Sequence, residues 1–148
     1  MSYREKENIV NIFSGLLITA IFAWTIYQRH LAGQFDLTSD FRNWGIILLI
    51  FMGVSIGARI LIYIVFHIIN TIATQEEELP ITDERDKLIQ LKSTRNSHYA
   101  FAVSMMLGFL SLAIGAPIYI ILVAFVASGL ISEIVDNGSQ IYYYRKGV

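Results

Sequence analysis

Residues 96–132 read NSHYAFAVSMMLGFLSLAIGAPIYIILVAFVASGLIS and contain no Asp, Glu, Lys or Arg. Residues 43–75, NWGIILLIFMGVSIGARILIYIVFHIINTIATQ, contain one charge, Arg59, and residues 8–28, NIVNIFSGLLITAIFAWTIYQ, contain none. A helix needs ~20 mainly apolar residues to cross the ~30 Å hydrocarbon core of a bilayer. One such stretch fits a buried helix, but three in a chain of 148 residues predict an integral membrane protein.

The overall composition points the same way. Hydrophobic residues make up 55% of the chain, charged residues 16%, and the mean hydropathy is +0.55, whereas soluble domains carry about 25% charged residues. There is no cysteine, which excludes disulfides and thiolate chemistry. The mixed charges of residues 4–7, REKE, and the lack of a small-residue cleavage motif predict that the first apolar run is a retained span.

Gly115, Ala116 and Pro117 divide the longest uncharged stretch, as expected for a tight reversal between two helices. We therefore predict an all-α polytopic fold in which residues 1–148 form one domain with four transmembrane helices. The expected spans are about 9–27, 44–69, 97–115 and 117–136, with a cytosolic connection at about 70–96. Thr82 or Asp83 can cap a helix that starts in this connection and continues into the third span.

The basic residues predict the orientation. With four spans, eight of the 11 Lys and Arg residues fall at the N-terminus, in the 70–96 connection and at the C-terminus. Only Arg29 and Arg42 fall in the first connection, and none in the second. The positive-inside rule then places both termini in the cytoplasm.

Polar residues occur at one depth in all four expected helices. Glu133 lies ~24 Å along its helix from Pro117, and Arg59 lies ~22 Å along its helix from Trp44. Such residues inside a membrane are costly and usually face the bundle interior. The predicted intramembrane polar cluster, near the cytoplasmic face, is Asn11, Arg59, Tyr63, Tyr99, Glu133 and Asp136.

Three readings of Arg59 stay open at this stage. It can pair with Glu133, or with Asp136, at the base of the bundle, and such a pair can also serve a ligand or proton path. Alternatively, Arg59 extends to the cytosolic headgroups and Glu133 only marks the inner end of its helix.

Small residues form seams at helical spacing. Ser97, Phe101, Ser104, Gly108, Ser111 and Gly115 share one face of the third helix, and Gly53 and Gly57 are four apart on the second. Small residues let helices approach closely in lipid, so each seam predicts either packing within the chain or a homo-oligomer contact.

Other site chemistries find no support. The depths of His67 and His98 differ by ~9 Å, which argues against a shared metal or haem. The sequence has no nucleophile elbow, phosphate loop or zinc-protease motif, and its cytosolic cations alternate with acids, unlike a nucleic-acid surface. We expect no enzyme activity, no cofactor, no metal and no nucleic acid.

Residues 83–95, DERDKLIQLKSTR, followed by Tyr99, carry a resemblance to a known group. The segment resembles a D-E-R-x-x-x-I-x-x-K-x-x-R signature in small four-span prokaryotic membrane proteins of uncharacterised function, some encoded beside helix-turn-helix regulators. The resemblance implies a multi-pass protein of the prokaryotic plasma (inner) membrane and carries over no activity. Its marker positions are Asp83, Glu84, Arg85, Ile89, Lys92 and Arg95.

Three of the marker positions, Arg85, Ile89 and Lys92, fall near one helical stripe together with Tyr99. The stripe fits either cations that meet anionic headgroups or a docking surface for a partner or a second protomer. We therefore expect a non-enzymatic membrane protein that acts through protein interaction, as an accessory or regulatory subunit or a homo-oligomer. The alternative is a small transporter or channel component with an Arg59/Glu133 polar path. The expected partners are the lipid bilayer and a second copy or another membrane protein.

Overall fold

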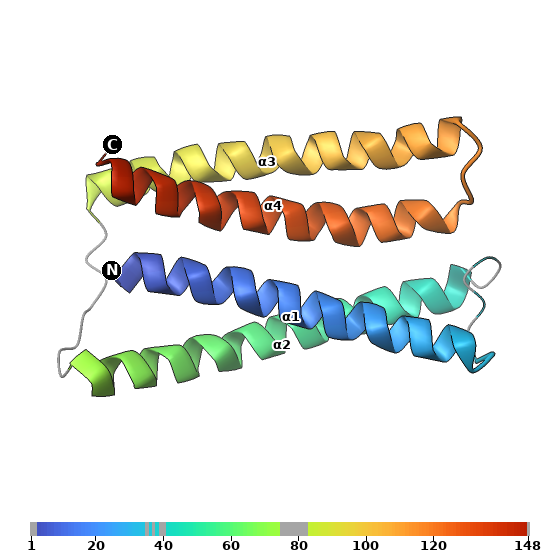
Figure 1. The fold of residues 1–148 in the computed structure, drawn as a ribbon, viewed down its shortest axis with the longest axis horizontal. Helices are drawn as coiled ribbons and strands as arrows, with labels where there is room; N and C mark the ends of the chain where they lie inside the picture. Colours follow the sequence, from blue (N-terminus) through green and yellow to red (C-terminus); the bar gives the residue numbers. More distant parts are fainter. Residues whose placement is uncertain (1–2, 35, 37, 39–40, 75–82, 148) are drawn as a thin grey trace.

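The computed structural model describes residues 3–34, 36, 38, 41–74 and 83–147. They form four helices, α1 (Tyr3–Leu31), α2 (Phe41–Thr74), α3 (Glu84–Ala113) and α4 (Tyr119–Lys146), which run along one long axis (Figure 1). The N- and C-terminal ends lie at the same end of the bundle (Figure 1). The all-helical class is therefore confirmed over the described residues.

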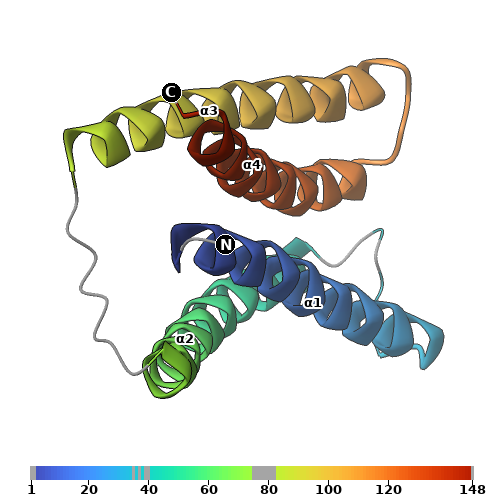
Figure 2. The same ribbon diagram turned by 60° about the vertical axis from the view of Figure 1, so that its left-hand side comes forward.

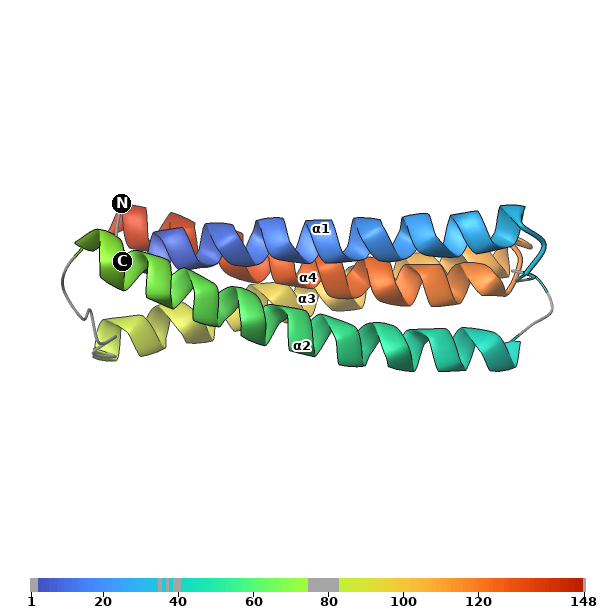
Figure 3. The ribbon, with the colours of Figure 1, turned by 90° about the horizontal axis from the view of Figure 1, so that it is seen from below.

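The four helices are arranged as two pairs. Figure 2 shows α3 lying along α4 and, beneath them, α1 lying beside α2. Seen from below, α1 and α4 lie against each other while α2 runs obliquely across them (Figure 3). α4 is thus the central helix, in contact with both α3 and α1.

Three helices, α1, α2 and α4, are long and apolar enough to cross a membrane. The chain therefore has the character of a membrane protein. α3 differs because its first half, from Glu84 to His98, is largely polar. The apolar part from Tyr99 to Ala113 is ~22 Å long, less than the ~30 Å hydrocarbon core.

α3 is nevertheless one continuous helix. Asp83 is its N-cap, and the Asp83 side chain accepts a hydrogen bond from the Glu84 N–H at 2.7 Å. Glu84 and Asp86 in the first turn suit the positive end of the helix dipole. Thr82, the other predicted cap, lies outside the described residues.

The helix ends differ from the predicted spans. α3 ends at Ala113, two residues before the predicted end of the third span. Gly115 has φ +92°, a conformation that favours glycine, and lies in the predicted reversal. Pro117 lies in the turn before α4 begins at Tyr119. α1, α2 and α4 extend past the predicted spans, to Leu31, Thr74 and Lys146 at their C-terminal ends.

The α3–α4 contact is built from small residues. Ser97 and Gly108 are buried on α3, and a Cβ added to Gly108 would lie 2.7 Å from the Cβ of Ala124 on α4. The Ser132 hydroxyl of α4 donates to the Ser97 carbonyl at 3.0 Å. The small-residue seam of the third helix is thus a contact within the chain.

α2 makes the sparsest contacts of the three apolar helices. Phe51 stacks on Phe22 of α1 at 4.2 Å between ring centres, and Trp44 is buried near its N-terminus. No residue in the most apolar segment of α2 is buried, and a Cβ at Gly53 or Gly57 would meet nothing within 4 Å. The small-residue seam of α2 therefore has no contact within the described chain.

Candidate functional site

A polar cavity of about 740 Å³ lies among the four helices, toward the end of the bundle that holds both termini. Each of the four helices contributes polar side chains to its wall. The polar wall residues are Arg4, Glu7, Asn8, Asn11, Arg59, Tyr63, Gln90, Ser97, Ser132, Glu133, Asp136, Asn137 and Gln140. Five of them lie on one face of α4, at helical spacing.

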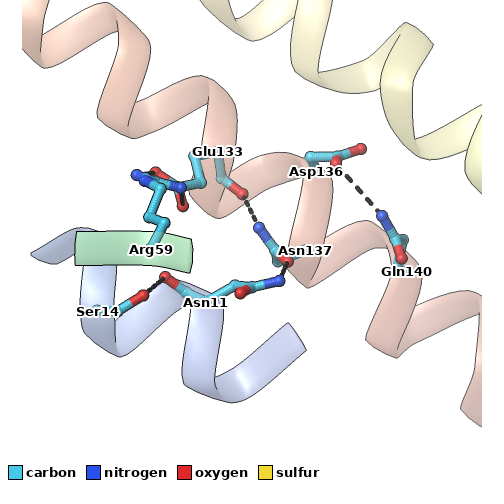
Figure 4. A network of polar contacts seen from close by, with 7 residues as sticks. All are labelled: Asn11, Ser14, Arg59, Glu133, Asp136, Asn137 and Gln140. Atoms are coloured by element: carbon cyan, nitrogen blue, oxygen red, sulfur yellow. Dashed lines mark hydrogen bonds and ion pairs between the residues drawn. The ribbon is translucent and has the colours of Figure 1, made fainter. Parts of the chain in front are cut away.

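Arg59 of α2 and Glu133 of α4 form a two-point ion pair in this wall (Figure 4). Each terminal guanidinium nitrogen of Arg59 donates to a different carboxylate oxygen of Glu133. This fork geometry orients both groups and is stronger than a single charged hydrogen bond. Of the three readings of Arg59 left open by the sequence, the structure has the pair with Glu133 rather than with Asp136.

The Glu133 carboxylate lies over Gly15 of α1. A Cβ added to Gly15 would lie 2.8 Å from Glu133 Oε2, which is closer than real side chains approach. The absence of a side chain at this position of α1 makes room for the carboxylate, so three helices, α1, α2 and α4, meet at the ion pair.

Asn11 and Asn137 extend the polar contacts toward the helix ends (Figure 4). Asn11 Nδ2 donates to Asn137 Oδ1 at 3.3 Å, and Asn137 Nδ2 donates to the Glu133 carbonyl oxygen at 2.8 Å. Asn137 is buried, with 6% of its surface exposed. The amides thus connect α1 to the turn of α4 that carries Glu133.

Asp136 lies one turn beyond the ion pair. Gln140 Nε2 donates to Asp136 Oδ2 at 3.2 Å, while Oδ1 is buried and has no hydrogen-bond partner among the described residues. Tyr63 of α2 is in the same wall.

Tyr99 is the predicted cluster residue that the structure places elsewhere. Its side chain is 63% exposed and is not part of the cavity wall. Ser97, two residues earlier, faces α4, and two residues turn a helix by ~200°, so Tyr99 points the opposite way. A depth count gives the height of a residue in a bundle but not its direction.

Several wall residues were not predicted from the sequence as part of the polar cluster, namely Arg4, Glu7, Asn8, Gln90, Ser97, Ser132, Asn137 and Gln140. A usable signal was present on α4, where Ser132, Asp136 and Gln140 are four apart and Glu133 and Gln140 are seven apart. That stripe predicts a polar face continuing beyond Glu133, provided that the helix does not end at Asp136.

The predicted docking stripe of residues 83–95 is divided between an internal contact and the exposed surface. Ile89 is 1% exposed and shares the face of Ser93 and Ser97, so it packs toward α4. Arg85 Nη2 donates to the Tyr144 carbonyl oxygen at 3.4 Å, and Lys92 Nζ lies 5.7 Å from the Tyr143 ring centre. The exposed stripe residues are Asp83, Glu84, Arg85 and Arg95.

Polar contacts also tie the helix ends near the termini. Arg145 Nε of α4 donates to Glu5 Oε1 of α1 at 3.0 Å, and the Tyr144 hydroxyl donates to Asp86 of α3 at 3.0 Å. Lys6 of α1 donates to Asn70 of α2 at 3.4 Å. The cavity is therefore bordered at this end by interhelical contacts.

Metal ligands do not gather in the described part of the chain, where no group of three His, Cys, Asp or Glu side chains is placed to hold an ion. The predicted absence of a metal site remains a prediction for the whole chain. Comparison with models of known families, with curated proteins and with solved structures found no match. The resemblance of residues 83–95 to small four-span membrane proteins likewise remains a prediction.

Proposed function

We propose that the chain is a small non-enzymatic transporter or channel component of a prokaryotic plasma membrane, with the polar cavity as the cytoplasmic part of its path. The carrying observation is the cavity of about 740 Å³ with a charged wall, set among helices apolar enough to cross a bilayer. A lone charge in mid-membrane costs ~2.5–3.5 kcal/mol, so intramembrane charges are usually paired, face the bundle interior or water, and mark substrate paths.

The proposal includes four spans with both termini in the cytoplasm. Support for α3 as the fourth span comes from its seam with α4, since α3 lies along α4 and the two are joined by the Gly115 turn (Figure 1). A short apolar segment is accommodated by local bilayer thinning and by flanking residues that extend to the headgroups.

Solute flux across proteoliposomes tests this function. Stopped-flow light scattering follows glycerol entry after an osmotic step, and glycerol is a small, uncharged probe. Gly129 lies in the cavity wall and a Cβ there would meet nothing within 4 Å, so Gly129→Leu adds a bulky side chain to the wall without a clash. Gly138 on the same helix is equally open but lies outside this wall, which makes Gly138→Leu the matched control.

We expect glycerol entry through the wild type and Gly138→Leu, and at least a threefold slower entry through Gly129→Leu. Glu133→Gln, which removes one charge of the ion pair, should also reduce the rate. Equal rates in empty liposomes and in wild-type proteoliposomes would refute the transport function.

A second function, an accessory subunit or homo-oligomer that acts through protein interaction, is favoured by the open face of α2. Gly53 and Gly57 lie four apart on the helix whose apolar segment is least buried, and close helix approach in lipid uses this spacing. Native mass spectrometry from detergent distinguishes the two functions. A stable dimer that Gly57→Leu separates, in a protein without flux, would favour the interaction function.

A further inference from the structure

The charges in the cavity wall do not balance. Arg4 pairs with Glu7 at 3.3 Å, and Arg59 pairs with Glu133. Asp136 is a third carboxylate in the same wall, and no ion pair joins it to a cation among the described residues. The wall therefore has three carboxyl side chains and two guanidinium side chains, which favours a positively charged occupant.

Two buried polar atoms in this wall have no hydrogen-bond partner. One is Asp136 Oδ1, and the other is Nδ2 of Asn8, whose residue is only 4% exposed. A buried polar atom without a partner costs about 1–3 kcal/mol, and such atoms in native proteins normally meet water, an ion or a ligand. Asp136, a residue of the cavity wall, therefore has acceptor capacity that the described side chains leave unused.

The remaining wall indicates which cation fits. Hard metal ions such as Ca²⁺ take six to eight oxygen ligands, usually with several carboxylates among them, and no three His, Cys, Asp or Glu side chains of the described residues are placed to hold an ion. Ile60 and Ile64 of α2 add an apolar part to the wall. An alkylammonium ion combines N–H donors with an apolar body and needs few acceptors.

We infer that the cavity binds a small organic ammonium ion, with its N–H groups donating to Asp136 and its alkyl part against Ile60 and Ile64. This inference rests on the proposed function, since it names the class of solute that would use the path. The ion pair of Arg59 and Glu133 orients the neighbouring wall and is not the counter-ion.

Ligand-dependent stabilisation of the purified protein tests the site. Ethylammonium chloride is the probe and sodium chloride at the same ionic strength is the comparison. A ligand that binds only the folded state raises the unfolding midpoint in a saturable way, by several degrees at ~100 times its dissociation constant. Asp136→Asn removes the charge with little change of shape, and Glu84→Gln removes an exposed carboxylate outside the cavity.

We expect ethylammonium, and not sodium, to raise the midpoint of the wild type and Glu84→Gln. The rise should be absent in Asp136→Asn. An equal rise with sodium, or an undiminished rise in Asp136→Asn, would overturn the assignment.

A second measurement uses the unchanged protein, in case Asp136→Asn does not fold. A hydrophobic carbodiimide modifies membrane carboxyl groups, and peptide mass spectrometry locates the modified residues. Ethylammonium should slow modification of Asp136 at least threefold and leave Glu84 unaffected. An unchanged rate at Asp136 would refute the site.

The two proposals can fail separately because glycerol carries no charge. Glycerol flux lost in Gly129→Leu, together with no ethylammonium effect, would retain the path and remove the ammonium site. Ethylammonium binding without any flux would retain the site and remove transport.

Discussion

Gly15 of α1 lies directly against the carboxylate of Glu133 on α4, with no room for a Cβ between them. The same carboxylate is held from the other side by Arg59 of α2. A glycine, an acid and a base on three helices thus form one contact, and the position of each depends on the other two. The Glu133 side chain is only 16% exposed, so Arg59 and not bulk water stabilises its carboxylate.

Gly15→Ala is predicted to destabilise the protein. The new Cβ would lie 2.8 Å from Glu133 Oε2 and must displace a carboxylate that Arg59 holds, and overpacking of this kind typically costs about 1–3 kcal/mol. Thermal unfolding in detergent measures the loss. Gly138→Ala, at an open position inside α4, is the control and should not lower the midpoint, because alanine favours a helix more than glycine does. Introducing Glu133→Ala should remove most of the Gly15→Ala effect, and an undiminished effect would contradict the contact.

Each single charge exchange at Arg59 or Glu133 is predicted to lower the yield of folded protein, and the double exchange is predicted to restore it. Arg59→Glu alone places two carboxylates together, and Glu133→Arg alone places two guanidinium groups together. An unpaired charge in mid-membrane costs ~2.5–3.5 kcal/mol, which the double exchange recovers in large part. The yield of folded, monodisperse protein is the measurement, and Arg95→Glu on the exposed side of α3 is the control. A double exchange as poor as the single ones would argue against the pair.

Gly108→Ala is predicted to loosen the α3–α4 contact. Its Cβ would lie 2.7 Å from the Ala124 Cβ, and neither group has a flexible end that can move away. We expect a lower unfolding midpoint, corresponding to ~1–3 kcal/mol. Ala124→Gly in the same chain should recover it. Gly45→Ala, where a Cβ meets nothing within 4 Å, serves as control. If Ala124→Gly gives no recovery, the two residues are not in contact.

Labelling of single cysteines is predicted to place the α1–α2 and α3–α4 turns on the same outer side. The chain has no cysteine, so variants carry one thiol each. With four spans, a membrane-impermeant maleimide applied to whole cells should label Gln34→Cys and Ala116→Cys. Glu84→Cys and Arg145→Cys should react only after permeabilisation. Labelling of Glu84 and Ala116 from the same side would mean that α3 does not cross the bilayer.

The candidate site was partly predictable because depth along a helix follows directly from residue number. Arg59, Glu133 and Asn11 were placed at one level by counting, and all three line the cavity. Tyr99 was placed at that level too but points away, since rotation about the helix axis depends on which face packs against a neighbour. Asn137, which links Asn11 to the turn of Glu133, was missed as a wall residue because the predicted span ended before it.

For the docking stripe too, the sequence did not determine which neighbours its residues contact. It did not show which of them meet lipid, a partner or the chain itself. Ile89 packs toward α4, whereas Asp83 and Arg95 remain exposed.

By itself, the sequence determined the helices and their membrane character, because apolar length and charge spacing act locally along the chain. Only the tertiary structure decided that Arg59 pairs with Glu133 and not with Asp136, and that Gly15 makes room for this pair. These contacts depend on how each helix is rotated about its axis and how closely the helices approach one another. In lipid that is set by close packing and interhelical hydrogen bonds, since the hydrophobic effect does not drive helices together there.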